Sequence, residues 1–210
     1  MSVIDERGKR VITERELRGA AAGDRLRIDE SAIVTPLAAD VAREAGIELV
    51  RESRRTAWRK YRIAIGADHG GYEAKEAIKI TLADLGHEVK DFGTNSTDPV
   101  DYPDFAYTVA LAVSRGHCDL GIIVDGAGIG SCMTANKVPG IRAAMCYDEA
   151  TARNSREHNG ANVLALGGKM VAIEKLKEVV KAWLSTELTE ERHRRRVEKI
   201  SAIERRYLRD

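Results

Sequence analysis

The chain has 210 residues, of which 43% are hydrophobic and 32% are charged, a composition that supports a folded core and excludes a disordered or fibrous protein. Its 34 Lys and Arg balance 33 Asp and Glu, so the net charge of +1 provides no global field that would draw the chain to nucleic acid or to an anionic membrane. No segment approaches the roughly 20 apolar residues of a transmembrane helix, and no signal peptide is evident. We expect a cytoplasmic protein without nucleic-acid or membrane partners, in which any anion binds at a local site.

Residues 1–50 predict a small α+β appendage. Thr13 and Glu16 have the spacing of a capping box, which predicts a helix that runs toward Gly23. A strand, a helix and another strand should follow, over 25–28, 35–45 with Thr35 as its N-cap, and 47–50. Elements this few and this short bury little surface, so we expect the appendage to dock on another surface.

Residues 51–60 predict a basic linker. The segment 51–62 holds six basic residues and one acidic residue, with Trp58 and Tyr61 between them. Basic and aromatic side chains together can bind nucleic acid. Because no wider positive patch surrounds them, we favour a solvated linker helix whose Trp packs on the following domain.

Residues 61–210 predict a separate domain in which short apolar runs alternate with amphipathic helices. We expect strands at 62–67, 87–92, 120–124, 141–146 and 162–166, and helices at 72–85, 103–115, 149–157, 171–184 and 189–207. This alternation predicts a three-layer αβα Rossmann-like fold with a five-stranded parallel sheet. Such sheets bind ligands at the carboxyl ends of their strands.

Several chemically active residues fall at the ends of these predicted elements. They are Asp68, His69, Tyr102, Asp125, His158 and Asn159, together with the glycine loop 126–130. The loop is not a dinucleotide fingerprint, because it follows the third strand of the domain and Ser131 stands where the last glycine should be. The three Cys residues form no C-x-x-C pair, so a structural zinc site is not expected. We interpret the set as an acid/base cluster beside an anion-binding loop.

Near the end of the chain, Arg192 and Arg196 are four residues apart, so they share one helical face on which two guanidiniums could clamp a phosphate. Taken alone, the charge run is more typical of a solvated helix face with neighbouring Glu residues. A phosphate site at this position therefore needs a further argument.

That argument is a resemblance. From Tyr61 onward the sequence resembles the family of ribose-5-phosphate isomerase B and galactose-6-phosphate isomerase. The matching motifs are, in chain order, Ile65-Gly-Ala-Asp-His-Gly-Gly71, Asp101-Tyr-Pro103, Gly126-x-Gly-x-Gly130, Ala135-Asn-Lys-Val138, Ser155-Arg-Glu-His-Asn159 with Asn162-Val163, and Arg192-His193 with Arg196-Val197.

The resemblance implies reversible aldose–ketose conversion of a phosphosugar without a metal or an organic cofactor. We expect ribose 5-phosphate to ribulose 5-phosphate, and the sequence leaves open whether the sugar has five or six carbons. It also implies a homodimer or tetramer with active sites at the subunit interface. Carried over by position, Asp68 and Tyr102 would hold sugar hydroxyls, His158 would help to open the ring and Asn159 would bind near the reacting carbons. The phosphate would meet His69, Lys169, Arg192 and Arg196, and the backbone of Gly126, Ala127, Gly128 and Gly130 would face the enediolate oxygen.

The sequence departs from the family pattern at the residues that handle protons. Asp125 stands where many members have a catalytic Cys, Ser131 where others have a Glu, and Ala127 where a Ser or Thr is usual. Lys169 replaces a frequent Arg. One hypothesis is that Asp125 is the base. The alternative is an inactive isomerase-like module that binds a phosphosugar or a protein partner.

The appendage carries a second resemblance. The segment 33–50 looks like a short segment that is common in proteins of bacterial microcompartments. It implies targeting to a shell or to a cargo protein, and hence a location inside such a compartment. An arm that stabilises the dimer is an equally weighted interpretation.

Overall fold

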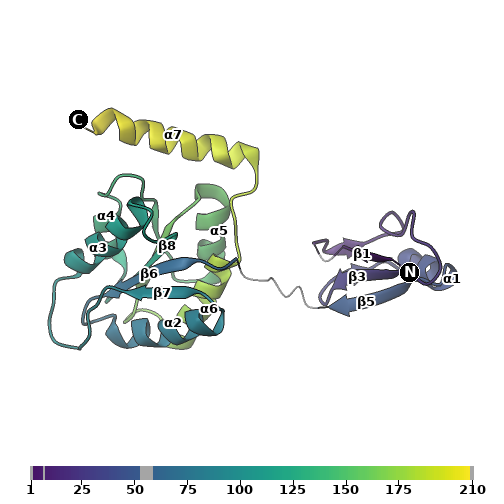
Figure 1. The fold of residues 1–210 in the computed structure, drawn as a ribbon, viewed down its shortest axis with the longest axis horizontal. Helices are drawn as coiled ribbons and strands as arrows, with labels where there is room; N and C mark the ends of the chain where they lie inside the picture. Colours follow the sequence, from purple (N-terminus) through teal and green to yellow (C-terminus); the bar gives the residue numbers. More distant parts are fainter. Residues whose placement is uncertain (1, 7, 53–58, 209–210) are drawn as a thin grey trace. The chain divides into compact units, whose positions relative to one another are not determined.

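A computed structural model describes residues 2–6, 8–52 and 59–208 of the chain. The chain divides into two compact units, Met1–Ala57 and Trp58–Asp210 (Figure 1). Most of the basic linker predicted at 51–60 falls on residues 53–58, which lie outside the described residues, and its first two residues instead end the strand β5 (Glu48–Glu52). Each unit is described by itself below.

The N-terminal unit is built from short parallel strands and one helix. Its elements are β1 (Val3–Asp5), β2 (Val11–Ile12), β3 (Arg25–Asp29), β4 (Ile33–Val34), α1 (Pro36–Glu44) and β5 (Glu48–Glu52). One sheet has the order β1-β3-β5 and a second pairs β2 with β4. Ile12, Leu26 and Ile28 are fully buried in a core that α1 closes with Ala38. This unit therefore has a hydrophobic core of its own.

Of the two helices predicted in this unit from capping residues, one is present and the other is not. Thr35 caps α1 as predicted, since its hydroxyl accepts the Ala38 N–H at 3.3 Å. The predicted helix toward Gly23 is wrong, because residues 14–19 form successive turns instead. Thr13 and Glu16 do bond to each other, with the Thr13 N–H and hydroxyl both 2.7 Å from the Glu16 carboxylate. Gly19 has a φ of 91°, which a right-handed helix cannot accommodate, so the capping contact closes a turn.

The second unit has the predicted alternation of strands and helices. Its strands are β6 (Arg62–Ala67), β7 (Glu88–Asp91), β8 (Leu120–Asp125), β9 (Ala143–Met145) and β10 (Val163–Gly167). Its helices are α2 (Tyr72–Asp84), α3 (Tyr102–Ser114), α4 (Ile129–Ala135), α5 (Glu149–Asn159), α6 (Ile173–Leu184) and α7 (Glu191–Tyr207). The strands are parallel in the order β7-β6-β8-β10-β9. The predicted sheet is confirmed, while α4 was not among the predicted elements.

Helices cover both faces of this sheet, as the αβα prediction requires (Figure 1). Ile63 and Ile65 of β6 point into a core shared with α2, α5 and α6, and the intervening Ala64 packs into a second core with α3 and α4. All three of these side chains are fully buried, which explains why the central strands are continuous apolar runs. Trp183 of α6 is completely buried on the first face.

The last helix, α7, packs on α5 and reaches the loop before β9, where the Glu204 carboxylate accepts the Gly140 N–H at 3.0 Å. His193 is the buried residue of α7, whereas Ile200 and Ile203 are 47% and 56% exposed. No helix in the described part of the chain is long and apolar enough to cross a membrane.

Candidate active site

The carboxyl ends of three adjacent strands bring the first group of predicted site residues together. β6 ends beside Val124 of β8, and Asp125 at the end of β8 pairs with Gly167 of β10. Asp68 follows β6 directly, and its N–H donates to the Val124 carbonyl at 3.2 Å. The Asp68 and Asp125 carboxyls are therefore neighbours at the edge of the sheet where open α/β sheets bind ligands.

Asp125 is 4% exposed, and backbone N–H groups surround its carboxylate. Oδ1 accepts from Ala127 at 2.8 Å and from Gly128, and Oδ2 accepts from Ser131 at 3.0 Å. A carboxylate has about four acceptor positions, so one remains on Oδ2. Two of the loop N–H groups expected to face an enediolate are thus occupied by Asp125. Ile129 and Gly130, in the first turn of α4, have no intrahelical acceptor and remain as donors.

Asp68 lies in a different environment. It is 8% exposed, and its Oδ1 accepts the Gly71 N–H at 2.9 Å. Burial raises the pKa of the Asp68 carboxyl, and the negative charge of Asp125 raises it further. The site therefore holds one carboxylate that accepts three N–H groups and one carboxyl that retains its proton to higher pH than usual.

Close backbone approaches give this site its shape. Gly128 has a φ of 82°, a left-handed conformation that turns the chain from β8 into α4. Tyr102, at the start of α3, lies against Gly130, where a methyl group would come within 2.7 Å of the Tyr102 hydroxyl. Tyr102 is 39% exposed, so its ring borders the loop from the solvent side.

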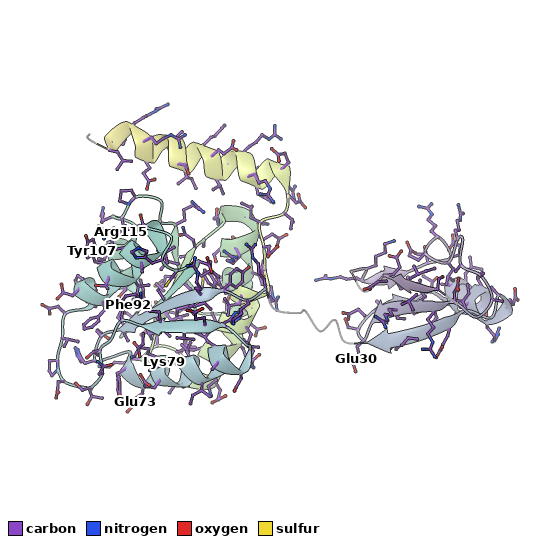
Figure 2. The ribbon with its side chains drawn as sticks, in the orientation of Figure 1. Glu30, Glu73, Lys79, Phe92, Tyr107 and Arg115 are labelled. Carbon is purple, nitrogen blue, oxygen red and sulfur yellow. The ribbon has the colours of Figure 1, made fainter. Side chains whose placement is uncertain are left out.

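A cavity of about 230 Å³ lies at the start of α2, beside the residues that directly follow Asp68. His69, Lys169 and Glu73 line it, the last of these labelled in Figure 2. The His69 ring is positioned by Val100, whose backbone nitrogen and oxygen lie 3.3 Å and 3.2 Å from Nδ1. An imidazole, an ammonium group and a helix N-terminus suit a phosphate group.

The other predicted residues form a second group on α5 and α7. The rings of His158 and His193 stack with centroids 4.2 Å apart, and Nδ1 of His158 lies 3.0 Å from the Asn154 amide nitrogen. Asn159 is the last residue of α5 and is exposed. Arg192 and Arg196 are exposed on α7, and Arg192 pairs with Glu190 at 2.7 Å.

Topology separates this second group from the first. The chain leaves α5 at Asn159 and enters β10 at Val163, whereas Asp125 pairs with Gly167 at the other end of β10. The two ends of a five-residue strand are about 13 Å apart. One copy of the chain thus places Asp68 and Asp125 at the carboxyl edge of the sheet, and His158 and Asn159 toward the amino edge.

Two supporting residues were not predicted from the sequence. The Tyr147 hydroxyl donates to the Ala127 carbonyl at 3.0 Å and so anchors the loop after β8. Tyr147 follows β9, so its place after a strand was an available signal. His193 belongs to a quoted motif, but its stacking on His158 depends on how α7 packs against α5. Burial lowers the pKa of His193, and His158 lowers it further.

No cluster of three or more His, Cys, Asp or Glu side chains in the described ranges is arranged to hold a metal ion.

Comparison with known proteins gives the family. The family model described as Ribose/Galactose Isomerase matches residues 63–200. The chain belongs to the ribose/galactose isomerase family. Ribose-5-phosphate isomerase B of Escherichia coli is 46% identical over 145 residues, which cover 69% of this chain and 97% of that protein. D-Erythrulose-4-phosphate isomerase of Pectobacterium atrosepticum is 42% identical over 144 residues, or 68% of this chain and 94% of that protein.

Solved structures of the isomerase family agree with the fold. Ribose-5-phosphate isomerase B of Clostridium thermocellum is 50% identical with a TM-score of 0.69, covering 70% of this chain and 99% of that one. The Mycoplasma genitalium enzyme, solved with bound ribulose-5-phosphate, is 39% identical with a TM-score of 0.66, covering 69% of this chain and 96% of that one. The predicted family and the Rossmann-like fold are confirmed, and so is the identification of the chain as an isomerase-type enzyme. The match does not reach the N-terminal unit.

Proposed function

We propose that this chain interconverts ribose 5-phosphate and ribulose 5-phosphate, with Asp125 as the base. The observation that carries the proposal is the Asp125 carboxylate, held at the tip of β8 between the Asp68 carboxyl and the start of α4. The family supplies the reaction class, because its named members are sugar-phosphate isomerases.

The first chemical step suits the free position on Asp125 Oδ2. The base removes the proton from C2 of the open-chain aldose, and the C–H electrons form the C1–C2 double bond of an enediolate. The negative charge that develops on O1 is stabilised by the N–H groups of Ile129 and Gly130 and by the dipole of α4. Protonated Asp125 then returns the proton to C1.

A second proton must move from O2 to O1 for the ketose to form. Many members have a hydroxyl residue for such proton handling where this chain has Ala127. We assign this transfer to Asp68, whose raised pKa allows its carboxyl to give a proton to O1 and take one from O2. His158 would open the sugar ring, and Tyr102 and Asn159 would hold its hydroxyls and reacting carbons.

A second copy of the chain completes the site in this proposal. His158, Asn159, Arg192 and Arg196 would be supplied by one copy to the Asp68 and Asp125 edge of the other. The distance along β10 between the two groups supports such sharing. So does the exposed apolar side of α7, where Ile200, Ile203 and Leu208 line a groove of about 600 Å³ with the segment before β9.

An activity assay tests the function directly. The purified full-length chain is incubated with ribose 5-phosphate, D-erythrulose 4-phosphate and galactose 6-phosphate, and the isomeric product is measured by NMR. We expect turnover of ribose 5-phosphate at the highest kcat/KM. Binding without turnover of any of the three would instead support the inactive binding module. The engagement of Asp125 by three N–H groups is the observation that favours that alternative.

For the N-terminal unit we propose docking to a microcompartment shell or cargo protein. Its support is the resemblance of residues 33–50 and the exposed apolar side chains of this unit. Val11 and Ile33, paired across β2 and β4, are 46% and 66% exposed, and Leu37 in α1 is 57% exposed. The test is co-purification of Ile33→Lys and Leu37→Lys variants with shell proteins. Loss of recovery at unchanged isomerase activity is expected. Unchanged recovery with an altered oligomeric state would instead support a dimer-stabilising arm.

A further inference from the structure

The amino ends of the strands border a cavity that the isomerase reaction does not use. It has a volume of about 600 Å³ and lies where β6, β8 and β10 begin. Five arginines line it, and we refer to it as the arginine pocket: Arg59, Arg62, Arg142, Arg156 and Arg194. This edge of the sheet is opposite the one that holds Asp68 and Asp125.

The charge in the arginine pocket is not balanced. Asp119 and Glu187 are the acidic residues that line it. Asp119 is already paired with Arg62 at 2.9 Å, and Glu187 accepts the Tyr61 hydroxyl at 3.3 Å. Four arginines therefore face one carboxylate, which leaves the lining with a net positive charge of +3 when Arg62 and Asp119 are counted as neutral.

Arg142 and Arg156 are half-buried and are fixed in place by backbone carbonyls. Arg142 Nε and Nη2 both donate to Gly160 O, at 3.0 Å and 2.9 Å. Arg156 Nε and Nη1 donate to Thr186 O and Ala161 O, at 3.1 Å and 2.7 Å. These contacts cap the end of α5, and they also hold the two guanidiniums rigid before any ligand arrives.

The caps use only part of the donor capacity. Each guanidinium has five N–H donors. These four hydrogen bonds and the side-chain hydrogen bond of Arg156 to Tyr61 leave five of the ten donors of Arg142 and Arg156 for another acceptor. Burial lowers the pKa of both arginines, and the charge of Arg142 lowers that of Arg156 further. An Arg side chain nevertheless stays charged, so an anion between the two would relieve both their desolvation and their mutual repulsion.

We propose that the arginine pocket is a second anion site, which binds the phosphate group of inorganic phosphate or of a small phosphorylated metabolite. Planar, preorganised guanidinium groups match the geometry of phosphate oxygens. The pocket is distinct from the proposed active site even where the two share a helix. A step of two residues turns about 200° around a helix. Arg156 is therefore on a different side of α5 from His158, and Arg194 is on a different side of α7 from Arg192 and Arg196.

Trp183 provides a direct readout. The Arg156 guanidinium carbon lies 4.9 Å from the centroid of the buried Trp183 ring, so an anion that binds Arg156 changes the field at this indole. The chain has two Trp residues, and a Trp58→Phe variant leaves Trp183 as the sole emitter. The variant is also given the Arg192→Gln and Arg196→Gln substitutions, which remove the arginines assigned to the substrate phosphate.

Inorganic phosphate and glycerol 3-phosphate are titrated separately into this protein, with sodium chloride of equal ionic strength as the control. We expect a saturable change in Trp183 emission with phosphate and none with chloride. Arg142→Gln should weaken binding by about tenfold, equivalent to 1.4 kcal/mol. Arg194→Gln should weaken it as well. Arg194 is exposed, and among the described residues its guanidinium donates to Leu188 O, so this variant tests the site without disturbing the core.

Equal affinities for the two probes, or tighter binding of inorganic phosphate, would show that the pocket recognises the phosphate group alone. Tighter binding of glycerol 3-phosphate would show that it also contacts the organic part of a phosphorylated metabolite. The proposal is overturned if neither probe changes the emission saturably. It is equally overturned if Arg142→Gln and Arg194→Gln, folded by circular dichroism, both bind with unchanged affinity.

Discussion

The separation of the two groups of site residues predicts that two inactive variants restore activity when they are combined. Asp125→Asn removes the proposed base at the carboxyl edge, and His158→Gln removes the proposed ring-opening residue on α5. Each variant alone should lose about 10²-fold or more in kcat, the usual effect of removing a group that transfers protons. His158 stacks on His193 and Asp125 is bonded to its own loop, so neither change should reach the other residue.

The size of the recovery follows from the geometry of a two-fold dimer. If each site takes Asp125 from one copy and His158 from the other, a mixed dimer contains one intact site and one site with both defects. Random pairing of equal amounts makes half of the dimers mixed, so the mixture should have about a quarter of wild-type activity. Mixed dimers isolated through two different affinity tags should have about half.

The assay is ribulose 5-phosphate formation after co-expression, compared with the two parent variants mixed without subunit exchange. Activity that stays at the mean of the parents would show that each chain contains a complete site, and the proposed sharing would be refuted. Full activity of Asp125→Asn alone would instead refute Asp125 as the base. In that case the same exchange is repeated with Asp68→Asn, so that the sharing is still tested.

Three further predictions concern stability. Asp125→Asn should lower the free energy of unfolding by about 1.5–3 kcal/mol in urea denaturation. Asn has one oxygen and one NH2 group, so it cannot accept the N–H groups of Ala127 and Gly128 at one end and that of Ser131 at the other; an unchanged value would contradict this bonding. Asp68→Asn should raise the melting temperature at pH 7. The folded-state pKa of Asp68 lies above its unfolded value of 3.8, so the carboxylate destabilises the fold as pH rises through that window, and the gain should vanish below about pH 3.8. A gain that is independent of pH would contradict it. Gly71→Ala should destabilise the fold by about 1–3 kcal/mol, because the added methyl group overlaps the Val124 carbonyl. The control is Gly126→Ala, whose methyl group would lie 3.8 Å from Lys169 Cδ. Equal unfolding midpoints of the two variants would contradict the packing at Gly71.

For the loop after β8, the sequence predicts the position of Asp125 but not its hydrogen bonds. The position of Asp125 and the glycines after the third strand could be predicted, because strand ends and glycine-rich turns leave local signals. The hydrogen bonds of the carboxylate could not be predicted, since they depend on how residues 126–131 fold back over β8. The loop backbone was expected to serve a substrate oxygen, yet part of it serves Asp125.

In the N-terminal unit, a local motif predicts a helix that the structure does not contain. The capping pair Thr13 and Glu16 forms its contacts, but no helix follows it. Here the left-handed conformation of Gly19 and the burial of Leu17 in the core of the unit outweigh a capping preference of about 1 kcal/mol. Tertiary packing also sets the parallel pairing of β2 and β4, two-residue strands that are too short to give a periodic signal.

The sequence by itself determined the alternating α/β domain, its family and the residue types of the site, because hydrophobic periodicity and strand-end motifs are local properties of the chain. Only the tertiary structure decided which of those residues lie together. The order β7-β6-β8-β10-β9 and the direction of α5 place Asp68 and Asp125 at one edge of the sheet and His158 toward the other. The tertiary structure also brings Arg142, Arg156 and Arg194 together, since these arginines come from distant segments of the chain and only the packed fold places their guanidiniums in one cavity.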